Sequence, residues 1–279
     1  MVLICVTAGR VLQTLPYGNA VCGVTLLDNL LYVLRDGLSS EQLEVYHKDS
    51  YHLQYRLTVS ALDSPADIVA CAHNRCAYIS DGGGGAQCVR RLALPCAAVR
   101  SSWPVNDKPA GLSVSDLHSL LVTCPEVRLV KEFSTDGRLL RQVQLPEDVV
   151  VPCHTAQLTG ARLAVCHGGY YDRAGRHRVC LIGSDGQVDK SFGGSCSSGT
   201  QQMNAPAHLA VDRNKFVFVA DLGNDRVLLL SSSLTYMREV MSTDKLKGWP
   251  RRLCLDEDKN RLYVAVNDSE GGQVAVVSI

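Results

Sequence analysis

The sequence has no excess of either charge, because its 28 Lys and Arg residues balance its 28 Asp and Glu residues. A strongly basic chain would point to nucleic acid or an anionic membrane, so this balance removes any global electrostatic argument for such partners. Long apolar runs are also missing, and no stretch reaches the ~18 residues of a membrane-spanning helix. With 279 residues, of which 46% are apolar and 20% charged, the composition is that of a folded globular protein.

Recognisable catalytic motifs are absent as well. The sequence contains no nucleophile elbow, no HExxH zinc motif, no Walker A loop and no paired CxxC motifs. The glycine run at 82–85 lacks the spacing of a dinucleotide-binding loop, and no alternation of strands and helices supports such a fold. We therefore expect no cofactor and no enzymatic activity.

The N-terminus and the cysteines bear on the cellular compartment. There is no basic leader, and the apolar run of residues 2–6 is shorter than the ~7–15 residues of a secretory signal. Most of the 12 cysteines lie inside apolar runs, where a free thiol behaves as a small hydrophobic side chain. A chain of this length also builds a core without disulfides. We expect a cytoplasmic protein whose thiols are mostly free.

A repeat of about 44 residues organises the chain. Similar segments open with a proline at spacings of 44, 43, 54 and 44 residues, and these prolines are Pro65, Pro109, Pro152, Pro206 and Pro250. The same pattern without the proline begins 44 residues earlier, at Val21. Each unit holds four short runs rich in β-branched and aromatic residues, divided by Asp, Asn, Gly and Ser. Residues 1–279 are therefore predicted to form one all-β domain, a six-bladed β-propeller with four-stranded antiparallel blades starting near residues 21, 65, 109, 152, 206 and 249.

The last unit indicates how the ring closes. Residues 249–279 contain only three strand-like runs, and residues 9–15 supply a fourth. We therefore expect the N- and C-terminal strands to share one blade, which removes an exposed sheet edge. Residues 2–6 resemble a further strand. Two interpretations of this surplus stay open: the chain is a fragment of a longer protein, or the segment is an extra outer strand or lies loose.

One unit carries a family resemblance. Residues 206–240, PAHLAVDRNKFVFVADLGNDRVLLLSSSLTYMREV, closely resemble an NHL repeat, with the opening proline, the Ala-Val-Asp strand, the VAD strand and an N-x-R-V segment. A weaker copy begins at Pro250. The chain is thus similar to the C-terminal propeller of tripartite-motif proteins. This resemblance implies a non-catalytic platform that binds protein or RNA, with ubiquitin-ligase activity only where a longer chain also carries a RING module.

Basic and aromatic residues gather in two segments that a propeller places on one face, among the loops from second to third strands and the connectors between blades. The two sets are Tyr170, Tyr171, Arg173, Arg176 and Arg178, and Lys245, Lys247, Trp249, Arg251 and Arg252. The charged groups of Arg173, Arg176, Arg251 and Arg252 are expected to be exposed. Such a surface suits single-stranded RNA, through phosphate pairing and base stacking, and equally an acidic or aromatic protein partner. We expect one of these partners, no membrane and no double-stranded DNA; a plain solvated face is the alternative.

A second set of residues lies two positions after each blade start. These residues are Asp67, His154, His208 and Arg252, with Gly23 and Gly111 in the two remaining repeats. Because first strands line the central channel of a propeller, we expect these side chains at the channel mouth. The alternative function is therefore a channel-centred, metal-dependent enzyme, lyase-like or hydrolase-like, that uses His154 and His208.

Two zinc arrangements are nevertheless disfavoured. Cys153 and His154 lie opposite Cys166 and His167 in a predicted hairpin, but adjacent strand residues point to opposite sides, so the four cannot share one ion. In a related propeller, the lyase half of peptide-amidating enzymes, zinc is held by histidines directly after the blade prolines. The corresponding residues here are Ala66, Ala110, Cys153, Ala207 and Arg251. We therefore predict no metal site.

Overall fold

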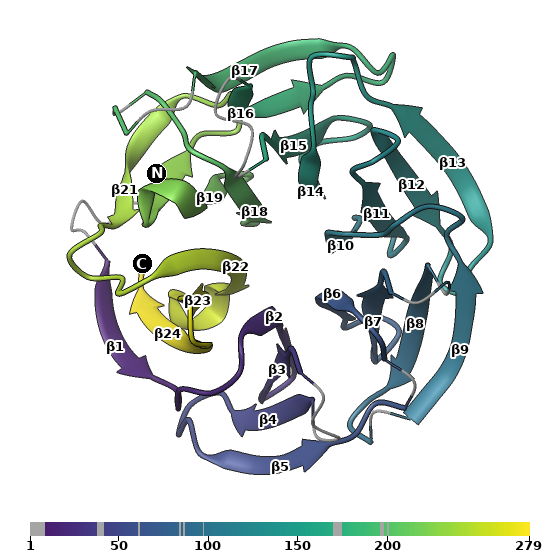
Figure 1. The fold of residues 1–279 in the computed structure, drawn as a ribbon, viewed down its shortest axis with the longest axis vertical. Coiled ribbons are helices and arrows are strands. Elements are labelled where there is room, and N and C mark those ends of the chain that lie inside the picture. Colours follow the sequence, from purple (N-terminus) through teal and green to yellow (C-terminus); the bar gives the residue numbers. More distant parts are fainter. Residues whose placement is uncertain are drawn as a thin grey trace.

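Six four-stranded sheets stand as blades around a central axis (Figure 1). The computed structural model describes residues 9–37, 42–60, 62–83, 85, 87–96, 98–169, 175–195, 198–199 and 201–279. Every strand pairing in the six sheets is antiparallel, and the molecule is a six-bladed β-propeller, as the repeat predicts. Within the described ranges, no helix has the length and apolar character needed to cross a membrane.

The innermost strand of each blade runs beside the axis. These strands are β2 (Val21–Leu27), β6 (Pro65–Cys71), β10 (Leu112–Val114), β14 (Pro152–Gln157), β18 (Pro206–Val211) and β22 (Trp249–Asp256). Proline is tolerated at the first residue of a strand because its missing N–H is not needed for the ladder there. The second strands are β3 (Leu30–Arg35), β7 (Cys76–Asp81), β11 (Leu120–Cys124), β15 (Leu163–His167), β19 (Val217–Asp221) and β23 (Arg261–Asn267).

The two outer strands complete each blade. The third strands are β4 (Leu43–His47), β8 (Cys88–Ala93), β12 (Leu129–Phe133), β16 (Arg176–Ile182), β20 (Arg226–Leu230) and β24 (Gly272–Ser278). The outermost strands are β5 (Leu53–Leu57), β9 (Ala98–Pro104), β13 (Leu139–Gln144), β17 (Val188–Ser195), β21 (Tyr236–Met241) and β1 (Arg10–Thr14). Two short 3-10 helices, η1 (Leu222–Asn224) and η2 (Glu257–Lys259), lie in loops.

The ring closes through the two ends of the chain. Strand β1 pairs antiparallel with β24, so that Arg10 lies opposite Ser278 and Thr14 opposite Ala275. The predicted closure of the last blade by N- and C-terminal strands is therefore confirmed. The surplus strand predicted at residues 2–6 falls outside the described residues.

Each interface between neighbouring blades has its own apolar cluster. Between the second and third blades, for example, Trp103 packs edge-on against Tyr78, with ring centroids 6.0 Å apart, and also contacts Phe133. A blade is a thin sheet and cannot bury its own two faces, so its apolar residues are covered only by the adjacent blades.

The cysteines contribute to these clusters. Ten cysteines lie in the described part of the chain as free thiols, and seven of them are buried. Cys71, Cys76 and Cys124 join the same cluster as Trp103, where they act as small apolar side chains.

Buried carboxylates at the ends of two second strands fasten the blade connectors. Asp81 accepts a hydrogen bond from the backbone N–H of Ser64 at 2.9 Å and forms an ion pair with Arg90 at 3.0 Å. Asp221 accepts a hydrogen bond from the backbone N–H of Asn204 at 2.8 Å and has its own arginine partner. These carboxylates thus fix the connector that enters each of the two blades.

A β-bulge near the start of the inner strand recurs in five blades. The ladder skips one residue between Val21 and Gly23, Pro65 and Asp67, Pro152 and His154, Pro206 and His208, and Pro250 and Arg252. Bulges redirect the side chain that follows them. Here the redirected residue is always the one two positions after the blade start.

Candidate functional site

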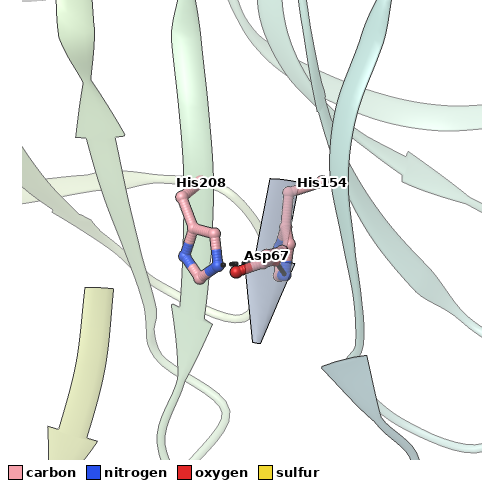
Figure 2. Close-up of side chains that lie close together, drawn as sticks. All are labelled: Asp67, His154 and His208. Atoms are coloured by element: carbon pink, nitrogen blue, oxygen red, sulfur yellow. Dashed lines mark ion pairs between the residues drawn. The ribbon is translucent and has the colours of Figure 1, made fainter. Parts of the chain in front are cut away.

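Four polar side chains from four blades meet at the axis of the propeller. They are Asp67, His154, His208 and Arg252, and we call them the axial cluster. All are more than nine-tenths buried. The Asp67 carboxylate lies beside the two imidazole rings (Figure 2), and its Oδ2 atom is 3.6 Å from Nε2 of His208 and 4.0 Å from Nε2 of His154. The rings themselves lie 3.8 Å apart between centroids.

Arg252 does not lie on the exposed face where the sequence predicts it. Its Nε atom donates to Oδ1 of Asp67 at 3.1 Å, and its side chain is 9% exposed. The expectation of an exposed Arg252 is therefore wrong, because the bulge after Pro250 directs this side chain to the axis instead of outward. Its guanidinium charge is paired with the Asp67 carboxylate inside the protein.

Two glycines leave the space that these contacts need. A Cβ atom on Gly111 would lie 2.6 Å from Cδ2 of His154, and one on Gly23 would lie 2.6 Å from Cγ2 of Ile68. Gly23 and Gly111 belong to the blades on either side of the Asp67 blade. Without side chains at these two positions, Arg252 and His154 reach Asp67 from blades that are not its neighbours.

The cluster also satisfies the free edges of the inner strands. Asp67 accepts hydrogen bonds from the backbone N–H groups of Ile68 and Leu112, both at 2.9 Å. Arg252 donates to the carbonyl oxygen of Ala66 at 2.6 Å. The inner strand of a blade has no partner on its axial side, so these buried backbone groups would otherwise lack hydrogen bonds.

Each imidazole bridges blades through both ring nitrogens. Nδ1 of His154 accepts from the backbone N–H of Leu209 at 3.4 Å, and its Nε2 lies 3.0 Å from the carbonyl oxygen of Leu112. Nδ1 of His208 accepts from the backbone N–H of Leu253 at 3.3 Å. Because Nδ1 accepts in both residues, the single proton of each neutral ring resides on Nε2.

Burial sets the charges of the cluster. It lowers the pKa of His154 well below the usual value, and the neighbouring His208 lowers it further. Burial also lowers the pKa of His208, although Asp67 opposes this shift. Burial opposes ionisation of Asp67 as well, but the Arg252 guanidinium and the His208 ring hold its pKa far below the usual range. At neutral pH one carboxylate and one guanidinium therefore face two neutral rings.

Three members of the axial cluster form the one group of potential metal ligands in the described part of the chain. One ligand atom from each of Asp67, His154 and His208 lies within 4.8 Å of the others. Metal binding at Nε2 requires the ring proton on Nδ1, where second-shell acceptors normally receive it. Here Nδ1 of both rings faces a backbone N–H donor, and Arg252 already neutralises the carboxylate. The donor set does not fit a divalent metal.

The Cys153, His154, Cys166 and His167 quartet does not converge either. His154 pairs with Cys166 in the ladder, as expected, but Cys153 is the bulged residue, so Pro152 and not Cys153 lies opposite His167. His154 points to the axis, whereas Nε2 of His167 accepts a hydrogen bond from an arginine of β16. No common ligand position results.

The first predicted binding segment is only partly visible. Tyr170, Tyr171 and Arg173 lie outside the described residues. Arg176 is exposed and forms an ion pair with Asp148 at 2.8 Å. Arg178 is buried, shares Asp148 at the same distance and donates to Nε2 of His167 at 3.2 Å, so it is held inside the blade.

The second segment presents a regular pattern. Lys247, Trp249 and Arg251 are exposed, while the residues between them and the following Arg252 are half-buried or buried. This exposure is a local feature of the segment and does not follow from regular strand alternation, because Gly248 has a φ of +129° and Arg251 is the residue that the β22 ladder skips. The three exposed residues run from the blade connector into the start of the inner strand β22, and Lys245 lies exposed just before them. We call these three residues the basic-aromatic stripe.

The pairing of Asp67 with Arg252 was not predicted from the sequence. A signal for it existed, because opposite charges stand at equivalent positions of different repeats. Equivalent positions of a closed ring face one axis, and a lone buried carboxylate there needs a cation.

No protein-family model and no curated protein sequence match this chain. Solved structures do match it. Virginiamycin B lyase from Staphylococcus aureus aligns over 97% of this chain and 99% of its own, with a TM-score of 0.64 and 9% identity. Hydrazine synthase from Kuenenia stuttgartiensis aligns over 93% and 96%, with a TM-score of 0.65 and 12% identity. A chain of a nidogen–laminin complex aligns over 81% of each, with a TM-score of 0.61 and 13% identity. At such identities these likenesses establish the propeller fold alone.

Proposed function

We propose that this chain is a non-catalytic, NHL-type binding platform that works in the cytoplasm and contacts a protein partner. The contact surface is the face that carries the blade connectors and the loops between second and third strands. The observation that carries this proposal is the basic-aromatic stripe of Lys247, Trp249 and Arg251, exposed at alternate positions where the blade connector enters the inner strand β22. Tryptophan and arginine are the residues that most often dominate binding energy at protein interfaces.

The charge around the stripe favours a protein over RNA. Exposed acidic residues occupy other connectors and loops of the same face: Asp63, Glu126, Asp244, Asp268 and Glu270. Single-stranded nucleic acid follows a continuous basic groove, and these carboxylates would repel its phosphates. A protein surface of mixed charge can place an acidic group against Lys247 or Arg251 and a basic group against the neighbouring acids.

The axial cluster supports the non-catalytic part of the proposal. A general base needs a free lone pair within reach of its substrate. In His154 and His208, Nδ1 is taken by a backbone amide, and Nε2 carries the proton that points at Leu112 or Asp67. The catalytic alternative would require both rings to leave these partners.

Crosslinking and affinity capture from cytoplasmic extract, with and without nuclease, test the proposal. The test variants are Lys247→Glu with Arg251→Glu, and separately Trp249→Ala. Matched controls on the opposite side or the outer wall are Arg138→Glu with Lys190→Glu, and Met237→Ala, all at exposed positions. Thermal denaturation of every variant establishes that it is folded.

We expect the stripe variants to lose a nuclease-resistant partner and the controls to retain it. Loss of a central tryptophan anchor costs about 2 kcal/mol or more, which is roughly a thirtyfold loss of affinity. Nuclease-sensitive capture, with a salt dependence whose slope falls by about 0.7 for each charge removed, would instead identify single-stranded RNA. Equal capture by stripe and control variants would refute this surface altogether.

A further inference from the structure

A cavity of about 370 Å³ lies in the central channel on the side of the axial cluster away from the stripe. It extends from the rings of His154 and His208 to the turns that join first and second strands. The turn residues at its rim are Asp116, Asp212 and Lys215, with Glu257 of η2. Ligand pockets for small molecules begin at about this size.

The walls of this cavity combine apolar side chains with polar groups, which include Thr25, Ser113 and Gln157. Leu26, Val69, Val114, Val211 and Leu255 line it and belong to inner strands or to their ends. They are only half-buried, although most neighbouring strand residues are fully covered by adjacent blades. Since they line the channel, part of their apolar surface is available to a ligand there, and removing such surface from water is favourable.

The rim is anionic. Among the described residues that line the cavity, three carboxylates accompany a single ammonium group, that of Lys215. Lys215 pairs with Asp116 at 3.3 Å. Glu257 accepts the backbone N–H of Arg213 at 2.9 Å and lies 3.8 Å from the Nε atom of the same residue. Asp212 accepts the backbone N–H of Phe216 at 2.7 Å and forms no ion pair with the described residues, so it is the carboxylate that a cation at the rim would meet.

The ring nitrogens at the inner end of the cavity already have partners, whereas the Ser113 hydroxyl, in a residue that lines the cavity, has none among the described residues. The ring nitrogens of His154 and His208 are engaged by Leu112, Leu209, Leu253 and Asp67, as described for the axial cluster. The two imidazole rings line the cavity here, with centroids 3.8 Å apart and planes tilted by 32°. An aromatic or aliphatic group can pack against them.

We infer that this cavity binds a small amphipathic cation. Its apolar body lies against the apolar side chains of the channel wall and the imidazole rings, and its ammonium group lies at the rim beside Asp212. This site is independent of the stripe, and its occupant is distinguished from a protein partner by size and by the face from which it enters.

Three probes with one apolar body and different head groups test the inference: phenethylamine, phenethyl alcohol and phenylacetate. Binding to the full chain is measured by saturation-transfer NMR and titration calorimetry. We expect the amine to bind about threefold to fivefold more tightly than the alcohol, as a partly exposed charge pair allows, and phenylacetate to bind most weakly.

Variants of the full chain locate the site. Asp212→Asn keeps an acceptor for the Phe216 N–H and should remove most of the preference for the amine over the alcohol. Ala210→Phe fills the cavity and should abolish binding of all three probes. Ala70→Phe fills it from the opposite wall and serves if the first variant does not fold. The exposed Arg138→Glu, far from the cavity, should leave binding unchanged.

The inference is overturned if no probe binds at millimolar concentration, or if the three bind equally. Undiminished amine binding by a folded cavity-filling variant would also overturn it, since the ligand would then occupy another place.

Discussion

Replacing Asp67 by asparagine should destabilise the whole propeller. The change removes the carboxylate that pairs with the buried Arg252 guanidinium, whose side chain is 9% exposed. A buried ion pair that loses one partner leaves an uncompensated charge, and this costs about 3–5 kcal/mol. Folded proteins are stable by only about 5–15 kcal/mol, so the midpoint of thermal unfolding should fall by roughly 10 °C.

The double variant Asp67→Asn with Arg252→Met tests the reasoning more sharply. It removes both charges, so the desolvation penalty of Arg252 disappears with its partner. What remains is the loss of hydrogen bonds to Leu112 and Ala66, worth about 1–3 kcal/mol. We therefore expect the double variant to be more stable than Asp67→Asn alone, and the cycle to give a coupling energy of about 2 kcal/mol or more.

Urea denaturation followed by circular dichroism measures the four members of this cycle. An exposed pair supplies the control: Arg75 and Asp28 also join two blades at 2.7 Å, but their side chains are 67% and 53% exposed. Asp28→Asn should cost less than ~1 kcal/mol. If the Asp67 and Arg252 variants are additive within about 0.5 kcal/mol, the axial cluster does not act as a buried pair and the reasoning fails.

Four further outcomes follow from the same structure. Burial lowers the pKa of His167 to about 4 from an ordinary 6.5, so between these pH values the unfolded chain binds a proton at this residue and the folded chain does not. The free energy of unfolding should therefore fall by about 3 kcal/mol from this group as the pH is lowered from 6.5 to 4. In His167→Gln the urea midpoint should depend less on pH over this range. Gly111→Ala forces Cβ against Cys153 and His154 and should cost about 1–3 kcal/mol in the same assay, whereas Gly160→Ala meets no atom within 4 Å and is limited to its backbone strain. Elemental analysis of protein purified without chelator should find less than stoichiometric zinc, and a full equivalent removed by Asp67→Asn would show that the histidines rearrange to bind it. Thiol titration of the denatured, unreduced protein should find most of the 12 cysteines free, and four or more disulfides would reverse the cytoplasmic assignment.

The architecture could be predicted from the sequence because it depends on local periodicity. Four short strand-like runs in each ~44-residue unit, opened by prolines such as Pro206 and Pro250, indicate a blade wherever they occur. A three-run final unit and a strand-like segment at residues 9–15 together imply closure by β1 and β24. Repeat position also placed Asp67, His154 and His208 at the channel, since equivalent residues of a ring face its axis.

The state of those residues was decided only by the tertiary structure. Arg252 and Asp67 are 185 positions apart in the chain, and they meet because the ring closes. A Cβ atom on Gly23, in the blade between theirs, would lie 2.6 Å from Ile68 and 3.3 Å from the Asp67 backbone. The bulge that turns Arg252 inward shifts a ladder by one residue, and alternation in the sequence does not reveal it. Arg251, its neighbour with the same charge, stays exposed on the stripe. Composition and spacing thus predict the fold and the candidate residues. Burial and hydrogen-bond partners depend on all six blades at once. They determine which charged groups are exposed to a partner and which are paired inside the protein.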